Sequence, residues 1–284
     1  LTVYYSPAYV VEGKTETVTK ARLVAELIEA GKAGEVWLEA PKFATRKELE
    51  QIHSAEHVRS TFEDKHSFLE VGAWSQPLLD SILASTGGMR DAVKEALKNG
   101  RSGSLSSGLH HARRGAGNGF CQFNGLALAA LEALKKVKTV GILDLDAHAG
   151  GGTFDILGDN RRVFLADVTV NSFDSWEPTD EQRHFYAEVD DPRSYLGHVE
   201  DALHFLEPVD FLIYNAGMDT YEKAGGMKGI TKEMIRKREK LVVQWARARK
   251  VPHVFALAGG YKWGGLTLEQ VAELHLETVK AFAA

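Results

Sequence analysis

Two carboxylates and one imidazole alternate along residues 144–148 of this 284-residue chain, in the order Asp144, Asp146 and His148. The segment follows an aliphatic run, 139–143, that predicts a buried strand, and several glycines come just after it. Side chains two residues apart in an extended segment point the same way, so these three groups can line one side of a site. Carboxylates beside an imidazole suit a divalent metal such as zinc or iron. The structural alternative is an Asp-rich strand end that caps the following loop.

Three other stretches carry polar groups of a catalytic kind. His110 and His111 are adjacent in a region rich in Gly and Ser, and two histidines can supply a general base and a general acid near neutral pH. Asp219 follows a strand-like run and would complete a three-ligand metal site with an open position. Tyr261 follows two glycines, where a phenolic hydroxyl can donate to a developing oxyanion. Each stretch also has an ordinary interpretation as a loop or a strand-to-helix turn.

The elements that must position these residues alternate in the second half of the chain. Strand-like runs lie at 162–166, 209–214 and 253–257, and helical stretches lie near 195–205 and 232–249. This alternation predicts an α/β protein with a mostly parallel sheet and helices on both faces. Ligands bind beyond the carboxyl ends of such strands, so residues that follow different strands can converge. Because there is no Pro- or Ser-rich linker and no repeat, we expect one domain over residues 1–284.

Composition argues against several classes of function. The net charge is −5 without a long cluster of Lys or Arg, so no nucleic-acid partner is expected. No apolar stretch approaches the length of a membrane span, and no basic region followed by a long apolar core opens the chain. The lone Cys121 cannot form an internal disulfide, which favours a reducing compartment. We therefore expect a cytoplasmic globular protein without a membrane partner.

Two features of the first half are ambiguous. His53 and His57 are one helical turn apart and could form a metal pair, but acidic neighbours and a missing third ligand favour a surface or capping role. The segment 74–98 predicts helix, interrupted at Gly87-Gly88, where neighbouring elements could approach closely.

Five ordered strings resemble the arginase/deacetylase superfamily, specifically the histone deacetylase-like amidohydrolases. The strings are Gly-Leu-His-His-Ala at 108–112, Gly-Phe-Cys-Gln-Phe-Asn at 119–124, Asp-Leu-Asp-Ala-His at 144–148, Ala-Gly-Met-Asp at 216–219 with Gly-Gly-Met at 225–227, and Ala-Gly-Gly-Tyr at 258–261. The resemblance runs from about His53 to Phe282. It is nearest to the compact bacterial deacetylases similar to class IV enzymes.

The resemblance implies a set of site residues. The implied metal ligands are Asp146, His148 and Asp219, for zinc or alternatively iron. The implied catalytic residues are the tandem pair His110 and His111, Tyr261 at the substrate carbonyl, and Asp144 as the buried partner of His110. The implied substrate-binding residues are Gly119, Phe120 on a wall of the acyl-lysine channel, and Gly259. In the family Asp144 also helps to bind a monovalent cation, usually potassium.

Two positions depart from the family pattern. Ala149 replaces a second histidine, and Gly151 replaces the Asp or Asn that orients the second histidine of the tandem pair. We therefore expect His111 to lack its usual partner, which leaves its acid/base role open.

These observations predict a metal-dependent deacylase. It would remove an acetyl or other acyl group from protein lysine or a related small acylated amine, with His111 or His110 as proton acceptor and Tyr261 stabilising the oxyanion. A catalytically silent acyl-lysine binder is the alternative, although every ligand and Tyr261 are retained. An arginase-type hydrolase with two manganese ions is less favoured, because Ala149 and Gly151 supply no further ligands.

Overall fold

A central sheet of eight strands organises the computed structural model, which describes residues 1–11, 16–66 and 68–284. The strand order is β2-β1-β5-β10-β9-β6-β7-β8, and every neighbouring pair in it is parallel. The strands are β1 (Thr2–Tyr4), β2 (Trp37–Glu39), β5 (Arg101–Ser104), β6 (Val140–Asp144), β7 (Val163–Thr169), β8 (His184–Glu188), β9 (Leu212–Asn215) and β10 (His253–Ala256). A separate short hairpin pairs β3 (Phe68–Leu69) with β4 (Gly72–Ala73).

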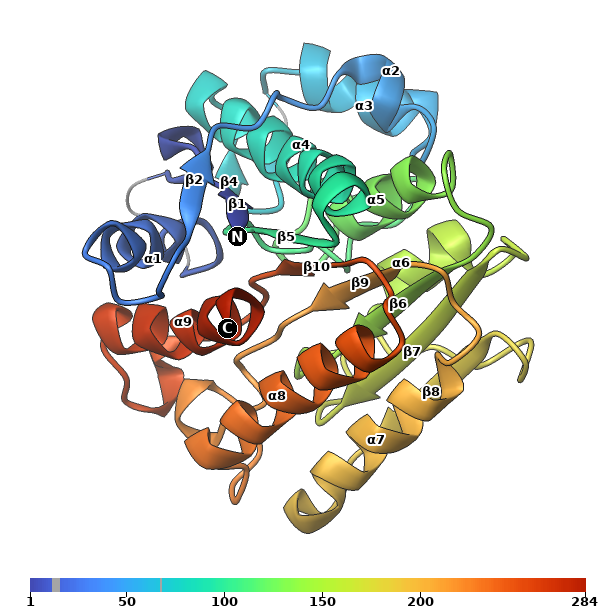
Figure 1. Ribbon diagram of the computed structural model, residues 1–284. Coiled ribbons are helices and arrows are strands. Elements are labelled where there is room, and N and C mark those ends of the chain that lie inside the picture. The colour runs from blue at the N-terminus through green and yellow to red at the C-terminus, as the bar shows by residue number, and fades with distance from the viewer. Residues whose placement is uncertain (12–15, 67) are drawn as a thin grey trace.

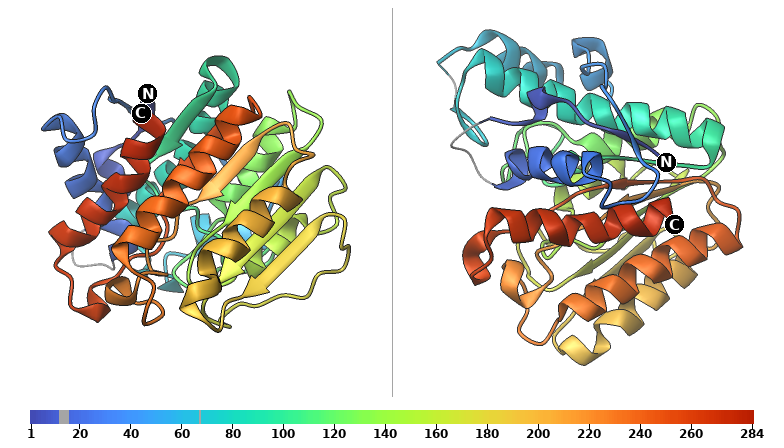
Figure 2. Two further views of the ribbon diagram at one scale, coloured as in Figure 1. Left: turned by 60° about the horizontal axis from the view of Figure 1, so that its bottom comes forward. Right: turned by 60° about the vertical axis from the view of Figure 1, so that its left-hand side comes forward.

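Helices cover both faces of this sheet (Figures 1 and 2). One layer contains α1 (Lys20–Glu29), α7 (Tyr195–Phe205), α8 (Lys232–Ala248) and α9 (Leu268–Ala283). The other contains α2 (Arg46–Leu49), α3 (Ala55–Glu63), α4 (Gln76–Asn99), α5 (Gly125–Ala133) and α6 (Gly151–Leu157). In the part of the chain that the structure describes, no helix is both long and apolar enough to cross a bilayer.

The two helical layers explain why the central strands are apolar at consecutive positions. In β9, Leu212 and Tyr214 pack into the core that contains α8 and α9, whereas Ile213 packs into the core that contains α4 and α5. In β10, Phe255 faces the first of these cores and Val254 the second. A strand that is buried on both faces needs apolar side chains throughout, so it lacks the alternation of a half-exposed strand.

The expected interruption at Gly87-Gly88 is wrong, because α4 continues through both residues. The expected close approach is present instead. A Cβ on Gly87 would collide with the backbone of Lys42, and one on Gly88 would collide with the Tyr9 hydroxyl. The two glycines therefore serve packing, and the buried contacts of α4 offset their low helix propensity.

Strand β5 has the sequence Arg-Ser-Gly-Ser, which carries no apolar signal for a strand. It lies between β1 and β10 near the centre of the sheet. A Cβ on Gly103 would collide with the ring of Phe255, so a small residue is required there. Because β5 is a strand, the loop with His110 and His111 begins at the same edge of the sheet as the loops after β6, β7, β9 and β10.

Candidate active site

The loops after β6 and β9 bring Asp146, His148 and Asp219 together. His148 Nδ1 lies 3.2 Å from Asp146 Oδ1 and 3.3 Å from Asp219 Oδ2. Both carboxylates are buried. Asp219 Oδ2 is close to His148 Nδ1 but accepts no hydrogen bond of normal geometry among the described residues. A buried carboxylate oxygen without a donor is costly unless a cation or a proton neutralises it. The three side chains therefore fit a divalent metal ion both in composition and in convergence.

These acidic side chains also shape the backbone that carries them. Asp144 Oδ1 accepts a hydrogen bond from the N–H of Asp146 at 3.1 Å, and Asp146 Oδ1 accepts from the N–H of His148 at 3.0 Å. Asp219 Oδ1 accepts from the N–H of Ala147 at 3.1 Å, which joins the β9 loop to the β6 loop. Hydrogen bonds from backbone N–H groups to these side chains therefore hold the segment 144–148 in a turn, and the segment is not a simple extended strand.

The charges around His148 favour a cation at this point. Burial would lower the pKa of His148, but contacts with Asp146 and Asp219 outweigh burial and raise the pKa to about 10. Burial and the charge of Asp146 raise the pKa of Asp219. Two adjacent carboxylates need a positive partner. A divalent cation can take the place of the imidazole proton, because a ligating histidine is neutral.

The tandem histidines have opposite electrostatic environments. Burial would lower the pKa of His110, but the charges of Asp144 and Asp146 outweigh burial and raise it to about 10. Burial and the charge of His110 lower the pKa of His111 to about 4. The two ring centroids are 3.9 Å apart. One member of the pair is therefore kept charged and the other neutral, the division that acid/base catalysis uses.

His111 lacks the family's usual partner, because position 151 is glycine, but another carboxylate contacts its ring. Nδ1 of His111 lies 2.9 Å from Oδ2 of Asp174, in the loop that follows β7. Asp174 has no recognisable motif around it, which is why the sequence did not reveal it. The one usable signal was its position just beyond the carboxyl end of a parallel strand.

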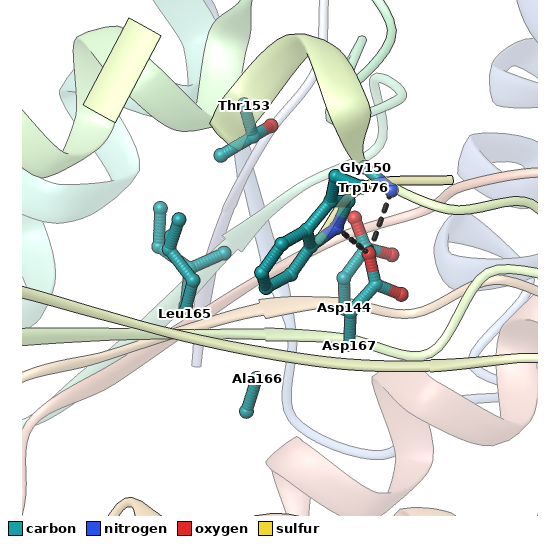
Figure 3. Close-up of a pocket in the computed structure, with 8 residues that line it drawn as sticks. Asp144, Gly150, Thr153, Leu165, Ala166, Asp167 and Trp176 are labelled. Carbon is teal, nitrogen blue, oxygen red and sulfur yellow. Dashed lines mark hydrogen bonds between the residues drawn. The ribbon is translucent and has the colours of Figure 1, made fainter. Parts of the chain in front are cut away.

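A second carboxylate, that of Asp167, lines the same small cavity as Asp144 (Figure 3). Asp167 Oδ2 accepts hydrogen bonds from the N–H of Gly150 at 2.7 Å and from Trp176 Nε1 at 2.9 Å, and Oδ1 is buried without a partner among the described residues. Burial and the charge of Asp144 raise the pKa of Asp167 to about 8. The sequence predicts Asp144 here but not Asp167, although the two residues are paired in register across β6 and β7.

Two buried side chains donate hydrogen bonds to the loop before Tyr261. Gly259 and Gly260 have φ values of +53° and +81°, which glycine adopts without strain. The carbonyl oxygen of Gly259 accepts from Lys20 Nζ at 2.5 Å and from His275 Nε2 at 3.3 Å. Neither Lys20 nor His275 was singled out in the sequence. Both side chains are fully buried, so their bonds to Gly259 hold the backbone that precedes Tyr261 in one position.

Most of the expected catalytic groups share one cavity. Its volume is about 20 Å³, which leaves room for roughly one water-sized group. Its lining includes His110, His111, Gly119, Asp146, Gly259 and Tyr261. Asp144 is not part of the lining, because it contacts the far side of the His110 ring at 2.7 Å.

Two exposed aromatic side chains flank this region. Phe120, which the resemblance places on the channel wall, is 37% exposed, and Phe173 is 45% exposed. The Phe173 ring centroid lies 5.0 Å from that of His111 and 5.9 Å from that of His148. Phe173 was not expected from the sequence. It places a second aromatic surface beside the tandem histidines and the metal ligands.

His53 and His57 are buried, so the expected surface role is wrong. His53 Nδ1 lies 2.8 Å from the carbonyl oxygen of Arg113, and its Nε2 accepts from the N–H of Asn124 at 3.0 Å. His57 Nε2 lies 2.8 Å from the carbonyl oxygen of Gln122. These bonds attach α3 and the turn before it to the segments on either side of Phe120, so both rings have a structural role.

Comparison with known proteins assigns this arrangement to a family. The histone deacetylase domain matches residues 14–181. The chain belongs to the histone deacetylase family. Membership of this family implies a deacetylase-type hydrolase with a divalent metal ion, for which the cluster of Asp146, His148 and Asp219 provides candidate ligands.

Several relatives of this histone deacetylase domain are similar in sequence. An uncharacterized protein of Picosynechococcus sp. is 29% identical over 276 residues, which cover 91% of both chains. Histone deacetylase 2 of Arabidopsis thaliana is 30% identical over 66% of this chain and 51% of its own. A probable deacetylase of Methanothermobacter thermautotrophicus is 30% identical over 59% of this chain and 54% of its own. The matched segments thus span about half the length of these two named deacetylases.

Two solved structures have the same fold. The HDA15 HD domain gives a TM-score of 0.80 at 19% identity, covering 99% of this chain and 88% of that chain. An acetylpolyamine aminohydrolase from Burkholderia pseudomallei gives a TM-score of 0.82 at 17% identity, covering 100% and 99%. These likenesses confirm the expected arginase/deacetylase-like α/β fold.

Proposed function

We propose that this histone deacetylase family member is a metal-dependent deacylase that hydrolyses the amide bond of an acylated amine, with acetyl-lysine as the first substrate to test. The observation that carries the proposal is the shared cavity, in which the tandem histidines and Tyr261 meet Asp146 of the candidate metal cluster.

Asp146, His148 and Asp219 would hold the divalent ion, zinc or alternatively iron. When bound, such an ion polarises a carbonyl oxygen and lowers the pKa of a water molecule. The buried Asp219 Oδ2 without a hydrogen-bond partner supports this assignment, since one unfilled acceptor is directed at the cluster.

We assign the proton transfers to His111. Because its Nδ1 is engaged with Asp174, the lone pair of the neutral ring is on Nε2, which accepts a proton from the attacking water. His110, kept charged by Asp144, stabilises the negative charge that develops nearby. Tyr261 donates to the acyl oxygen, and Gly119, Phe120 and Gly259 contact the substrate. His111 then returns the proton to the leaving amine.

A monovalent cation, usually potassium in the resembling family, would lie beside Asp144. The unpartnered Oδ1 of Asp167 supports a positive ion there, because two buried carboxylates lie side by side in register. We expect a higher melting temperature in potassium chloride than in choline chloride at equal ionic strength.

The decisive experiment combines metal analysis with turnover. Protein freed of metal by a strong chelator and reloaded with zinc or iron is assayed on acetyl-, butyryl- and longer acyl-lysine peptides and on acetylated polyamines. One ion per chain, with activity lost on chelation and regained on reloading, is expected. Full activity in the metal-free protein would contradict the mechanism. Two ions per chain would indicate an arginase-type site, and binding without turnover would indicate a silent acyl-lysine binder.

A further inference from the structure

We propose that Asp174 is the positioning residue of His111, supplied by the loop after β7 in place of the Asp or Asn that resembling proteins carry at position 151. The inference rests on the proposed deacylase function, because it concerns the residue assigned to proton transfer. It connects the carboxylate of Asp174 with the absence of a side chain at position 151, where the chain departs from the family pattern.

The surroundings of Asp174 fix its carboxylate tightly. The side chain is 1% exposed. Oδ2 lies 2.9 Å from His111 Nδ1 and accepts from the N–H of Gly152 at 3.2 Å, while Oδ1 accepts a hydrogen bond from Arg113 Nη2. A carboxylate held on both oxygens can orient the imidazole and keep its Nδ1 protonated, as an orienting acid does in catalytic triads.

Gly151 makes room for this carboxylate. A Cβ at position 151 would collide with the carbonyl oxygen of Asp174 and would lie 2.6 Å from its Oδ1. Gly151 opens α6 and has no left-handed backbone that would demand glycine. Space, and not conformation, therefore accounts for the glycine. A side chain at 151 and the carboxylate of Asp174 are mutually exclusive in this arrangement.

The loop that carries Asp174 is attached to the candidate metal loop. The N–H of Val170 donates to the carbonyl of Ala147 at 3.0 Å, and the N–H of Ala149 donates to the carbonyl of Phe173 at 3.0 Å. Asp174 has φ +58°, a conformation that Asp tolerates better than most residues. Successive residues thus meet His111 from two sides, the Phe173 ring and the Asp174 carboxylate. The same short loop therefore supplies the aromatic ring beside His111 and the carboxylate that orients it.

The test compares removal of the carboxylate with its conservative replacement. Asp174→Gly suits the left-handed backbone and removes the acceptor, whereas Asp174→Asn keeps an oxygen acceptor for His111. For the zinc-loaded protein we expect Asp174→Gly to lower kcat roughly 10- to 100-fold with KM and metal content little changed. Asp174→Asn should recover most of the lost kcat. Asp159→Asn, which removes an exposed carboxylate just after α6, is the matched control and should be neutral.

Gly151 is tested in the same way. Gly151→Ala should lower kcat about as much as Asp174→Gly, because the added methyl group displaces the carboxylate. Gly197→Ala, at an exposed glycine in α7 with nothing within 4 Å of its Cβ position, should have no effect. Wild-type kcat in Asp174→Gly, or equal losses in Asp174→Gly and Asp174→Asn, would overturn the proposal.

A readout without turnover separates this inference from the proposed function. In zinc-loaded protein with ¹⁵N-labelled histidine, His111 should show a protonated, slowly exchanging Nδ1, identified by its absence from His111→Gln. That signal should persist in Asp174→Asn and be lost in Asp174→Gly. If wild type hydrolyses no acylated amine, the proposed function fails while this measurement still decides the role of Asp174. An unchanged signal in Asp174→Gly would overturn that role.

Discussion

Asp144 Oδ2 lies 2.7 Å from His110 Nδ1, and the other oxygen of the same carboxylate accepts from Asn215 Nδ2 at 2.8 Å and from the N–H of Asp146 at 3.1 Å. Asp144 therefore orients one member of the tandem pair and turns the backbone toward the candidate ligands. It does not belong to the cluster of Asp146, His148 and Asp219.

From this arrangement we predict that Asp144→Asn lowers turnover roughly 10- to 100-fold and leaves about one divalent ion per chain. The amide weakens the charged form of His110 while keeping the size of the side chain. Steady-state kinetics and elemental analysis of the same preparation provide the measurement. Loss of the ion from a folded variant would instead make Asp144 a metal ligand.

Tyr261→Phe should separate an enzyme from a binder. The variant loses only the hydroxyl and keeps the ring that stacks on Trp263 at a centroid distance of 4.1 Å. Removal of one oxyanion donor typically lowers turnover by about 10²–10³, or roughly 3–4 kcal/mol. We expect kcat on an acetyl-lysine peptide to fall by that factor with metal content and melting temperature nearly unchanged. A variant with wild-type kcat would remove Tyr261 from the mechanism.

Gly259→Ala should disturb the metal site through a direct collision. Gly259 has φ +53°, and its Cβ would overlap the carboxylate of Asp219. Gly265 has φ +94° with no heavy atom within 4 Å of its Cβ position, so Gly265→Ala reports backbone strain alone, on the order of 1–2 kcal/mol. We expect at least about tenfold weaker zinc binding in Gly259→Ala and wild-type zinc binding in Gly265→Ala. Competition with a chromogenic chelator measures both, and equal affinities would refute the collision.

His53 should make the fold sensitive to acid. Burial and the neighbouring His57 lower the pKa of His53 to about 4, against a usual value of 6.5. Between these values the unfolded chain binds the proton and the folded chain does not, so stability is complete above pH 6.5 and declines as the pH falls toward 4. The contribution lost between pH 7 and pH 5 is about 2 kcal/mol.

His53→Gln keeps one donor and one acceptor without a titrating group. Urea unfolding at pH 7 and pH 5 should therefore show a smaller acid loss for His53→Gln than for wild type. The exposed His66 offers a matched control, and His66→Gln should follow wild type. Parallel pH dependence in wild type and His53→Gln would show that His53 does not contribute.

The sequence by itself determined which segments carry the chemistry. A strand-forming run followed by Asp-Leu-Asp-Ala-His, and similar runs before Asp219 and Tyr261, place polar groups at the ends of strands. Parallel strands end at a common edge, so these loops were expected to converge without knowledge of the strand order. Local patterns also fixed the long amphipathic helices, because their apolar spacing is a property of neighbouring residues.

Only the tertiary structure decided which side chains complete the site. Asp174 reaches His111 across 63 residues of chain, from a loop without periodicity or motif. Asp167 lies beside Asp144 because of the register between β6 and β7, and β5 packs beside Phe255 with a glycine at position 103. These contacts depend on which loops and strands are neighbours in space and on how closely their backbones approach. Neither quantity is encoded in the spacing of residues along the chain.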